Sequence, residues 1–363
     1  MVFGWASAPL GGRYVKSVDN MDAVSEVNDR YRLIGAPASP FSIKMRALMR
    51  YRRIPFDWVL RTDSVARELA HFKRPLMPTL QLPDSGEYLV DSTPLVHLLE
   101  ERHPEMRSVI PPDPAQRFLN ALLEDFADEW APKFVFHYRW HAQEDHAWAE
   151  RWVVGPTSEP ITAGGLDERA QAFGERQRGQ SFVAGATAEN APVLENSFER
   201  VTQTFEALFD CDTFLFGARP SSADFAWYGQ LMECFLCGHA GQIMRGRTPR
   251  LSYWLFMLED ASGWDGDWRP AEKKLSPPMR QLLTLAGDVY FPYLLATETA
   301  LNAGRDDVTA DLPGGPYRQG ISKYHVKCLN ALRREFAGLD RPVRQELEPL
   351  LEATGCLRPL LDA

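Results

Sequence analysis

The sequence predicts a small α/β domain followed by a larger all-helical domain, and three observations lead to this fold class. Short strand-like segments rich in β-branched and aromatic residues are confined to residues 31–90. A proline-rich break, Pro111 to Pro114, then interrupts the pattern. Beyond the break the apolar residues recur every three or four positions, which is the period of an amphipathic helix.

Composition and charge limit what the chain can be. Its 363 residues are enough for two domains, and a hydrophobic content of 45% with 11% aromatic residues is typical of a globular protein. The formal net charge of −9 argues against nucleic acid as a partner. No apolar run approaches the ~20 residues that cross a bilayer, and the N-terminus lacks the pattern of a secretory signal. We therefore expect a cytoplasmic protein with no membrane partner.

The first 29 residues show no sustained period and are interpreted as an N-terminal extension. In the α/β domain, placed at residues 30–104, the first helix is the clearest element, because Phe41, Met45 and Leu48 recur on one face. The predicted order is a strand at 31–35, a helix at 40–53, a strand at 56–60, a short helical stretch at 65–72, a hairpin of strands at 79–82 and 87–90, and a helix from Asp91 to Pro104.

The helical domain is placed at residues 113–270, and a C-terminal helical extension packed on it at 271–363. Glycine and proline mark an insert at 155–187 and a loop at 311–320. The predicted helices cover about 115–153, 190–210, 222–238 and 249–261, followed in the extension by 277–303 and two further helices that end at Leu361.

Four short motifs occur in a characteristic order. They are Ser39-Pro40-Phe41, Met77-Pro78-Thr79-Leu80, Asp91-Ser92-Thr93, and Ser221 to Asp224, which has the S-x-x-D spacing of a helix capping box. Together with the order of elements, these motifs resemble the glutathione transferase superfamily over about residues 30–261. The resemblance implies a thioredoxin-like N-terminal domain, an all-helical glutathione transferase-type C-terminal domain and a homodimer.

Ser39 is the candidate catalytic residue. It stands at the N-cap of a helix that begins with Pro40, where a serine hydroxyl accepts a hydrogen bond from the helix backbone. A helix N-terminus also stabilises a thiolate or carboxylate placed before it. In serine-type transferases the hydroxyl at this place donates to the sulfur of bound glutathione. The resemblance therefore gives Ser39 a role in activating the thiol in addition to capping the helix.

The resemblance also implies which residues bind glutathione. The backbone of Met77 would pair with the cysteinyl part, and Pro78 would follow a cis peptide bond. Asp91 and Ser92 would hold the γ-glutamyl group, with an aspartate that is shorter than the glutamate common at this place.

Aromatic and histidine side chains are densest between residues 134 and 152. The resemblance implies that the hydrophobic substrate pocket is built there, and the candidate walls are Phe41, Phe134, Tyr138 and Trp140. The alternative for these aromatic residues is ordinary core packing.

Other chemistry finds little support in the sequence. His137 and His141 have a spacing that can bind a metal, but neither an H-E-x-x-H motif nor a cysteine accompanies them, so no metal site is predicted. Cys234 and Cys237 have C-x-x-C spacing inside an apolar helical segment, where buried thiols acting as small hydrophobic groups are the simpler interpretation.

The predicted function is that of a glutathione transferase-like enzyme, typical of detoxification. It would bind glutathione, as co-substrate or cofactor, and activate its thiol for attack on a small apolar electrophile. Two alternatives stay open: a catalytically silent scaffold of the same fold, and a glutathione-dependent isomerase or lyase. Asp63 favours the scaffold, because some transferase classes have a basic residue at this place that helps to bind the glycyl end of glutathione. Lys73 or Arg74 could take over the role of that basic residue. The sequence does not name the electrophile.

Overall fold

The computed structural model describes residues 29–71, 76–158, 165–273 and 275–361. Its N-terminal part is a four-stranded sheet with the strand order β2-β1-β3-β4. Strand β1 (Tyr31–Gly35) pairs in parallel with β2 (Phe56–Leu60) and antiparallel with β3 (Thr79–Gln81), which in turn pairs antiparallel with β4 (Tyr88–Val90). Residues 1–28, which belong to the predicted N-terminal extension, lie outside the described residues.

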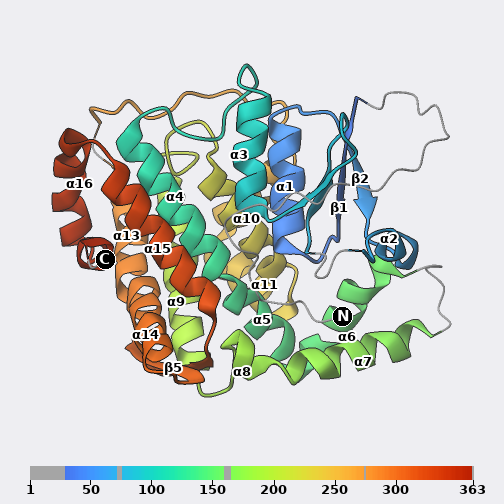
Figure 1. The fold of residues 1–363 in the computed structure, drawn as a ribbon. Coiled ribbons are helices and arrows are strands. Elements are labelled where there is room, and N and C mark those ends of the chain that lie inside the picture. Colours follow the sequence, from blue (N-terminus) through green and yellow to red (C-terminus); the bar gives the residue numbers. More distant parts are fainter. Residues whose placement is uncertain (1–28, 72–75, 159–164, 274, 362–363) are drawn as a thin grey trace.

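Three helices accompany this sheet: α1 (Pro40–Tyr51), α2 (Asp63–Glu68) and α3 (Ser92–Arg102). Figure 1 shows α1 and α3 between the sheet and the later helix α4 (Pro114–Glu129), with α2 on the far side of the sheet. Helix α1 buries Met45, Leu48 and Met49, as the period of its apolar residues predicts. This arrangement is a thioredoxin-like α/β domain, so the fold class predicted for the N-terminal part is confirmed.

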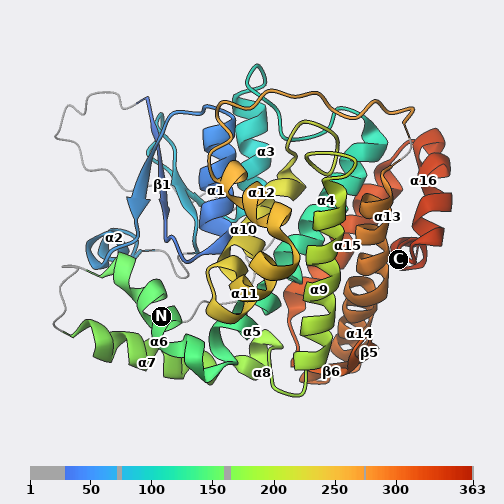
Figure 2. The ribbon, with the colours of Figure 1, turned by 180° about the vertical axis from the view of Figure 1, so that it is seen from behind.

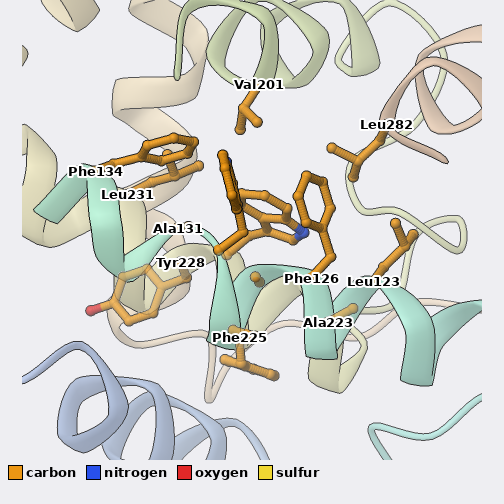
Figure 3. Close-up of a cluster of buried hydrophobic side chains, with 14 of the residues drawn as sticks. Leu123, Phe126, Ala131, Phe134, Val201, Ala223, Phe225, Tyr228, Leu231 and Leu282 are labelled. Atoms are coloured by element: carbon orange, nitrogen blue, oxygen red, sulfur yellow. The ribbon is translucent and has the colours of Figure 1, made fainter. Parts of the chain in front are cut away.

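A helical region follows, and its centre is a cluster of apolar side chains from several helices. The helices are α4 (Pro114–Glu129), α5 (Pro132–Trp140), α6 (Gln143–Val154), the 3-10 turn η1 (Gly155–Thr157), α7 (Leu166–Arg178), α8 (Ser181–Ala184), α9 (Ala191–Leu208), α10 (Ser222–Phe235), α11 (Gly238–Arg247) and α12 (Pro249–Glu259). Figure 3 shows side chains of α4, α5, α9 and α10, among them Phe126, Phe134, Val201 and Leu231, pointing toward one another.

Helix α10 begins with the predicted capping box. The Ser221 hydroxyl accepts from the Asp224 amide at 3.3 Å, and the Asp224 carboxylate accepts from the Ser221 amide at 2.8 Å. The other carboxylate oxygen accepts from the Leu215 amide, which fixes the chain that leads into the helix.

The range 115–153, predicted to be helical, is divided into three helices in the structure. Helix α4 ends at Glu129, and α5 begins at Pro132. A proline has no N–H to donate and its ring clashes with the carbonyl four residues earlier, so it is best tolerated in the first turn of a helix. Pro132 takes that place in α5.

The C-terminal extension packs beside α4 and α9, as Figure 2 shows from behind. Its elements are α13 (Pro277–Leu285), the π-helical turn η2 (Ala286–Tyr290), α14 (Phe291–Asn302), strands β5 (Asp307–Leu312) and β6 (Gly315–Gly320), α15 (Lys323–Gly338), α16 (Arg341–Ala353) and α17 (Leu357–Leu361). No helix among the described residues is long and apolar enough to cross a membrane.

The loop predicted at 311–320 is instead part of the antiparallel hairpin β5-β6. Tyr317 and Gln319 are buried and alternate with the exposed Pro316 and Arg318, which is the period of a half-buried strand. The Asn190 side chain, just before α9, donates to the Arg318 carbonyl at 2.7 Å and accepts from the Arg318 amide at 3.0 Å. A side-chain amide therefore pairs with the edge of β6 as another strand would.

Candidate functional site

A cavity of about 950 Å³ lies where the ends of the α/β domain's strands face α5, α7 and the C-terminal extension. Six of the nine site residues predicted from the sequence contribute to its wall: Ser39, Phe41, Met77, Asp91, Ser92 and Trp140. The folded chain therefore brings together residues that are up to about a hundred positions apart. The volume is in the range of small-molecule sites.

Ser39 lies at the N-terminal end of α1. Its backbone is extended (φ −103°, ψ 115°), and its hydroxyl accepts from the Ser42 amide at 3.3 Å, so it caps the helix. The side chain is buried from solvent and lines the cavity. The capping bond uses the hydroxyl oxygen as an acceptor and leaves its proton free to be donated to a group in the cavity.

Met77 lines the cavity beside the end of α1. The Met77–Pro78 peptide bond is cis, as predicted from the resemblance. Pro78 itself is buried and is not part of the cavity wall. Pro78 therefore acts on the site through the backbone conformation of Met77.

Asp91 and Ser92 lie at the N-terminal end of α3. Ser92 is buried, and Asp91 has a left-handed backbone conformation (φ 82°) that is uncommon for an aspartate. Burial raises the pKa of the Asp91 carboxyl, and this effect is opposed by Lys44 and by the Thr93 backbone. A cationic group of a ligand near Asp91 would favour its charged form.

Basic side chains also line the cavity. Asp63, at the start of α2, forms an ion pair with Arg169 of α7, with 3.1 Å between Oδ2 and Nη2. Arg61 also lines the cavity, and burial lowers its pKa. The acidic side chain at position 63 is thus compensated by an arginine from the second part of the chain. The suggested substitutes Lys73 and Arg74 lie outside the described residues.

The apolar wall comes mainly from α5 and α7. Phe41, Phe136, Trp140 and Phe173 line the cavity, and the rings of Trp140 and Phe173 lie 6.3 Å apart. A flat apolar ligand has aromatic surface to pack against here.

The structure corrects the placement of Phe134 and Tyr138, which are not part of the cavity wall. Both rings pack against Phe198 of α9, with centroids 5.7 and 4.7 Å away. Figure 3 shows Phe134 pointing into the core beside Leu231 and Val201. Residues four apart lie on one face of a helix, and on α5 that face is the core side.

A lysine, a glutamate and a histidine that belong to none of the sequence motifs also line the cavity. Lys133, Glu129 and His325 all line it and are buried. His325 Nε2 lies 3.3 Å from Glu129 Oε2, and its Nδ1 lies 2.9 Å from the Tyr293 hydroxyl. The only sequence signal is a lysine among apolar residues in Trp130 to Phe136.

Burial sets the protonation of this cluster. It raises the pKa of Glu129 well above its usual range, reinforced by Asp125 and Asp128, and it lowers the pKa of His325. Burial also lowers the pKa of Lys133 to about 7, with Glu129 acting in the opposite direction. The cavity therefore holds an amine that is about half neutral near pH 7 beside a carboxyl group that keeps its proton.

A second buried lysine, Lys44 of α1, has the opposite environment. Its ammonium lies 2.7 Å from Glu124 Oε1 and 2.6 Å from Asp128 Oδ2, both on α4. Burial acts to lower the pKa of Lys44, but the two carboxylates outweigh it and raise the pKa. Glu124 also accepts from the Ser222 hydroxyl, so one network links α1, α4 and α10.

Two motifs noted in the sequence lie outside the cavity. Cys234 and Cys237 are buried, and burial raises the pKa of the Cys237 thiol to about 12. His137 and His141 stack with ring centroids 4.6 Å apart, and burial lowers the pKa of His137 to about 4. Among the described residues, no group of three or more histidine, cysteine, aspartate or glutamate side chains is arranged to hold a metal ion.

Comparisons with known proteins support the same family for the N-terminal part. The family model for the glutathione S-transferase N-terminal domain matches residues 33–107. No curated protein matches the sequence.

Several solved structures resemble the chain at low identity. A glutathione S-transferase from Methylobacterium radiotolerans, in complex with glutathione sulfonate, is 20% identical, with 68% of this chain and 100% of that chain covered and a TM-score of 0.42. Glutathione transferase GSTFuA3 from Phanerochaete chrysosporium is 15% identical (66% and 98% covered, TM-score 0.44). The beta-etherase LigF from Sphingobium sp. strain SYK-6 is 18% identical (69% and 98% covered, TM-score 0.43).

Proposed function

Because residues 33–107 form a domain of the glutathione S-transferase N-terminal family, we propose that the chain binds glutathione in the cavity and activates its thiol for attack on a small apolar electrophile. The observation that carries this proposal is the position of Ser39. It caps α1 and lines the same cavity as Met77, Asp91 and Ser92. A homodimer and a cytoplasmic location belong to the same proposal.

Thiol activation would follow from the local physics of the α1 N-terminus. The Ser39 hydroxyl donates a hydrogen bond to the glutathione sulfur, which stabilises the thiolate over the thiol. The positive end of the α1 dipole acts in the same direction. A larger thiolate fraction raises the rate of nucleophilic attack, because the thiolate is the nucleophile.

The rest of the tripeptide would be held from two sides. The Met77 backbone pairs with the cysteinyl unit, and Asp91 with Ser92 receives the γ-glutamyl amine and carboxylate. The glycyl carboxylate would lie toward Arg61 and Arg169, which replace the basic residue absent at position 63. The electrophile would pack on Phe41, Phe136 and Trp140.

We expect Ser39→Ala to bind glutathione but to activate it poorly. Calorimetric titration should give an affinity within a few-fold of the wild type. The thiolate absorbance of bound glutathione, followed against pH, should report a thiol pKa raised by about one unit or more, because one hydrogen bond to the charged form is lost. Turnover with an aryl halide should fall by about 10²-fold.

The matched control is Ser42→Ala. Ser42 is buried on the same helix, lies outside the cavity wall, and its hydroxyl has no hydrogen-bond partner among the described residues. This variant should leave the thiol pKa unchanged. Equal thiol pKa values in wild type and Ser39→Ala would rule out the proposed role, and absence of glutathione binding by the wild type would favour the scaffold.

We expect Asp91→Ala to weaken glutathione binding by about tenfold or more, since the ligand's ammonium loses a buried charged partner. Titration with γ-glutamylcysteine and with cysteinylglycine separates the two ends of the tripeptide, because only the first carries the amine that Asp91 would hold. Asp84→Ala, on the exposed hairpin turn, is the control and should bind both peptides as the wild type does. A uniform loss for both peptides would contradict the assignment.

A further inference from the structure

Lys44 and Lys133, the two buried lysines among the described residues, differ in one respect that bears on chemistry. Lys44 is held by two carboxylates, whereas Lys133 forms no ion pair within the described part of the chain. The Lys133 amine lies instead over the rings of Tyr293 and Trp130, 4.8 and 5.5 Å from their centroids. Lys133 also lines the cavity, whereas Lys44 does not.

From this placement we infer that Lys133 is a carbonyl-reactive amine, which takes an aldehyde or ketone of apolar small-molecule character as an imine. The inference goes beyond the proposed function and does not depend on glutathione. Its geometric basis is an amine that has no ion-pair partner among the described residues, lies over two aromatic rings, and stands at the wall of a cavity large enough for a small molecule.

Protonation supports the same role. A lysine attacks a carbonyl only as the neutral amine, and burial lowers the pKa of Lys133 to about 7. Lys44, equally buried, has a raised pKa because Asp128 and Glu124 stabilise its ammonium. The two lysines therefore form an internal comparison in one protein.

Glu129 is placed to move the protons that imine formation needs. It lines the cavity four residues before Lys133, its raised pKa keeps it protonated, and it lies 3.3 Å from His325, which in turn contacts the Tyr293 hydroxyl. The C-terminal extension supplies both His325 and Tyr293. The extension thus contributes to the chemistry of the cavity as well as to its wall.

The step balances without any other reactant. The Lys133 nitrogen adds to the carbonyl carbon, and the carbinolamine forms with a proton transferred from nitrogen to oxygen. Protonation of its hydroxyl by Glu129 lets water leave as the C=N bond forms, and loss of the remaining N–H proton returns the proton to Glu129. The net change is amine plus carbonyl to imine plus water, and hydrolysis reverses it.

The test is reductive trapping of the full-length protein with benzaldehyde and sodium cyanoborohydride at pH 7.5, without glutathione. Peptide mapping by mass spectrometry should find the benzyl group on Lys133 at an initial rate at least about tenfold above that of the exposed Lys273 and Lys323, because an exposed amine is almost fully protonated at this pH. Lys44 should stay unlabelled.

Three variants make the result specific. Lys133→Met and Lys133→Arg should abolish the cavity label, and their thermal melting shows whether each is folded. Glu129→Gln should slow labelling by about tenfold or more while the label stays on Lys133. Unchanged labelling in Glu129→Gln would overturn the role of Glu129 as proton donor.

The proposal as a whole is overturned if Lys133 reacts no faster than the exposed lysines. It is also overturned if benzoate stabilises the wild type against heat, but not Lys133→Met, while benzaldehyde is not trapped, because Lys133 would then hold a carboxylate. Both readouts are independent of glutathione titration, so a failure here is distinct from a failure of the proposed transferase function.

Discussion

Replacing Lys44 by methionine is expected to destabilise the protein by about 3–5 kcal/mol near pH 7, because it leaves Glu124 and Asp128 buried without their cation. Both carboxylates lie within 2.7 Å of the ammonium and are almost completely buried. Methionine fills a similar volume, so the loss is electrostatic rather than a cavity effect. Urea unfolding followed by tryptophan fluorescence measures the change.

The effect of Lys44→Met should depend on pH with a definite sign. Without the lysine, the pKa values of the two carboxyls in the folded state are raised above those of the unfolded chain, so the unfolded state loses its protons first as pH rises. The loss of stability in the variant is therefore largest at pH values above the folded-state pKa values of the two carboxyls, and it is smallest near pH 4. An equal loss at pH 4.5 and pH 8 would contradict this cause.

A compensated variant tests the network directly. Adding Glu124→Gln and Asp128→Asn to Lys44→Met removes the uncompensated charges, and it should recover a large part of the lost stability, which is a strongly non-additive result. Lys273→Met, at an exposed position, should change the free energy of unfolding by no more than about 0.5 kcal/mol.

Replacing Lys133 by methionine is expected to stabilise the protein, which is the opposite sign for the same substitution. Burial moves the pKa of Lys133 from 10.5 to about 7. A pKa shift of that size corresponds to a cost of several kcal/mol for holding the protonated amine in the folded state. Lys133→Met removes this cost, so the free energy of unfolding is expected to increase by about 2–4 kcal/mol near pH 7. The neighbouring Glu129 stays protonated and so leaves no bare charge.

The pH dependence again follows from the direction of the shift. Between pH 7 and pH 10.5 the unfolded chain binds more protons at Lys133 than the folded protein does, so wild-type stability from this group rises with pH. The gain in stability from Lys133→Met should be largest below pH 7 and should disappear toward pH 10.5. Thermal melting of both proteins at pH 6.5 and pH 9.5 measures it, and a constant difference would exclude the titration of Lys133 as the cause.

Local sequence predicted the elements whose signals are themselves local. The hairpin of β3 and β4, the helix capped at Ser39 and the capping box of Ser221 and Asp224 depend on residues a few positions apart, so turn and capping chemistry is readable from the sequence. The order of the motifs also predicted the fold class, although each motif taken alone is only a weak signal of the family.

Helix faces and short strands were harder to predict. The family resemblance predicts Phe134 and Tyr138 as pocket walls, but in a segment that is aromatic on every side the periodicity does not say which side meets the core. Tyr317 and Gln319 alternate with exposed residues, but the flanking glycines and prolines favour a loop in the sequence. The strand also pairs with Asn190, which is more than a hundred residues away, and local sequence does not reveal such a contact.

The sequence by itself determined the α/β plan of the N-terminal domain and the residues that meet at the ends of α1 and α3, because caps, turns and strand period are local. Only the tertiary structure decided that Arg169 reaches Asp63, that the extension lines the cavity with His325, and that, among the described residues, Lys44 has ion-pair partners while Lys133 has none. These outcomes depend on burial and on charges from distant segments, and the energy of a charge in a protein is set by those surroundings.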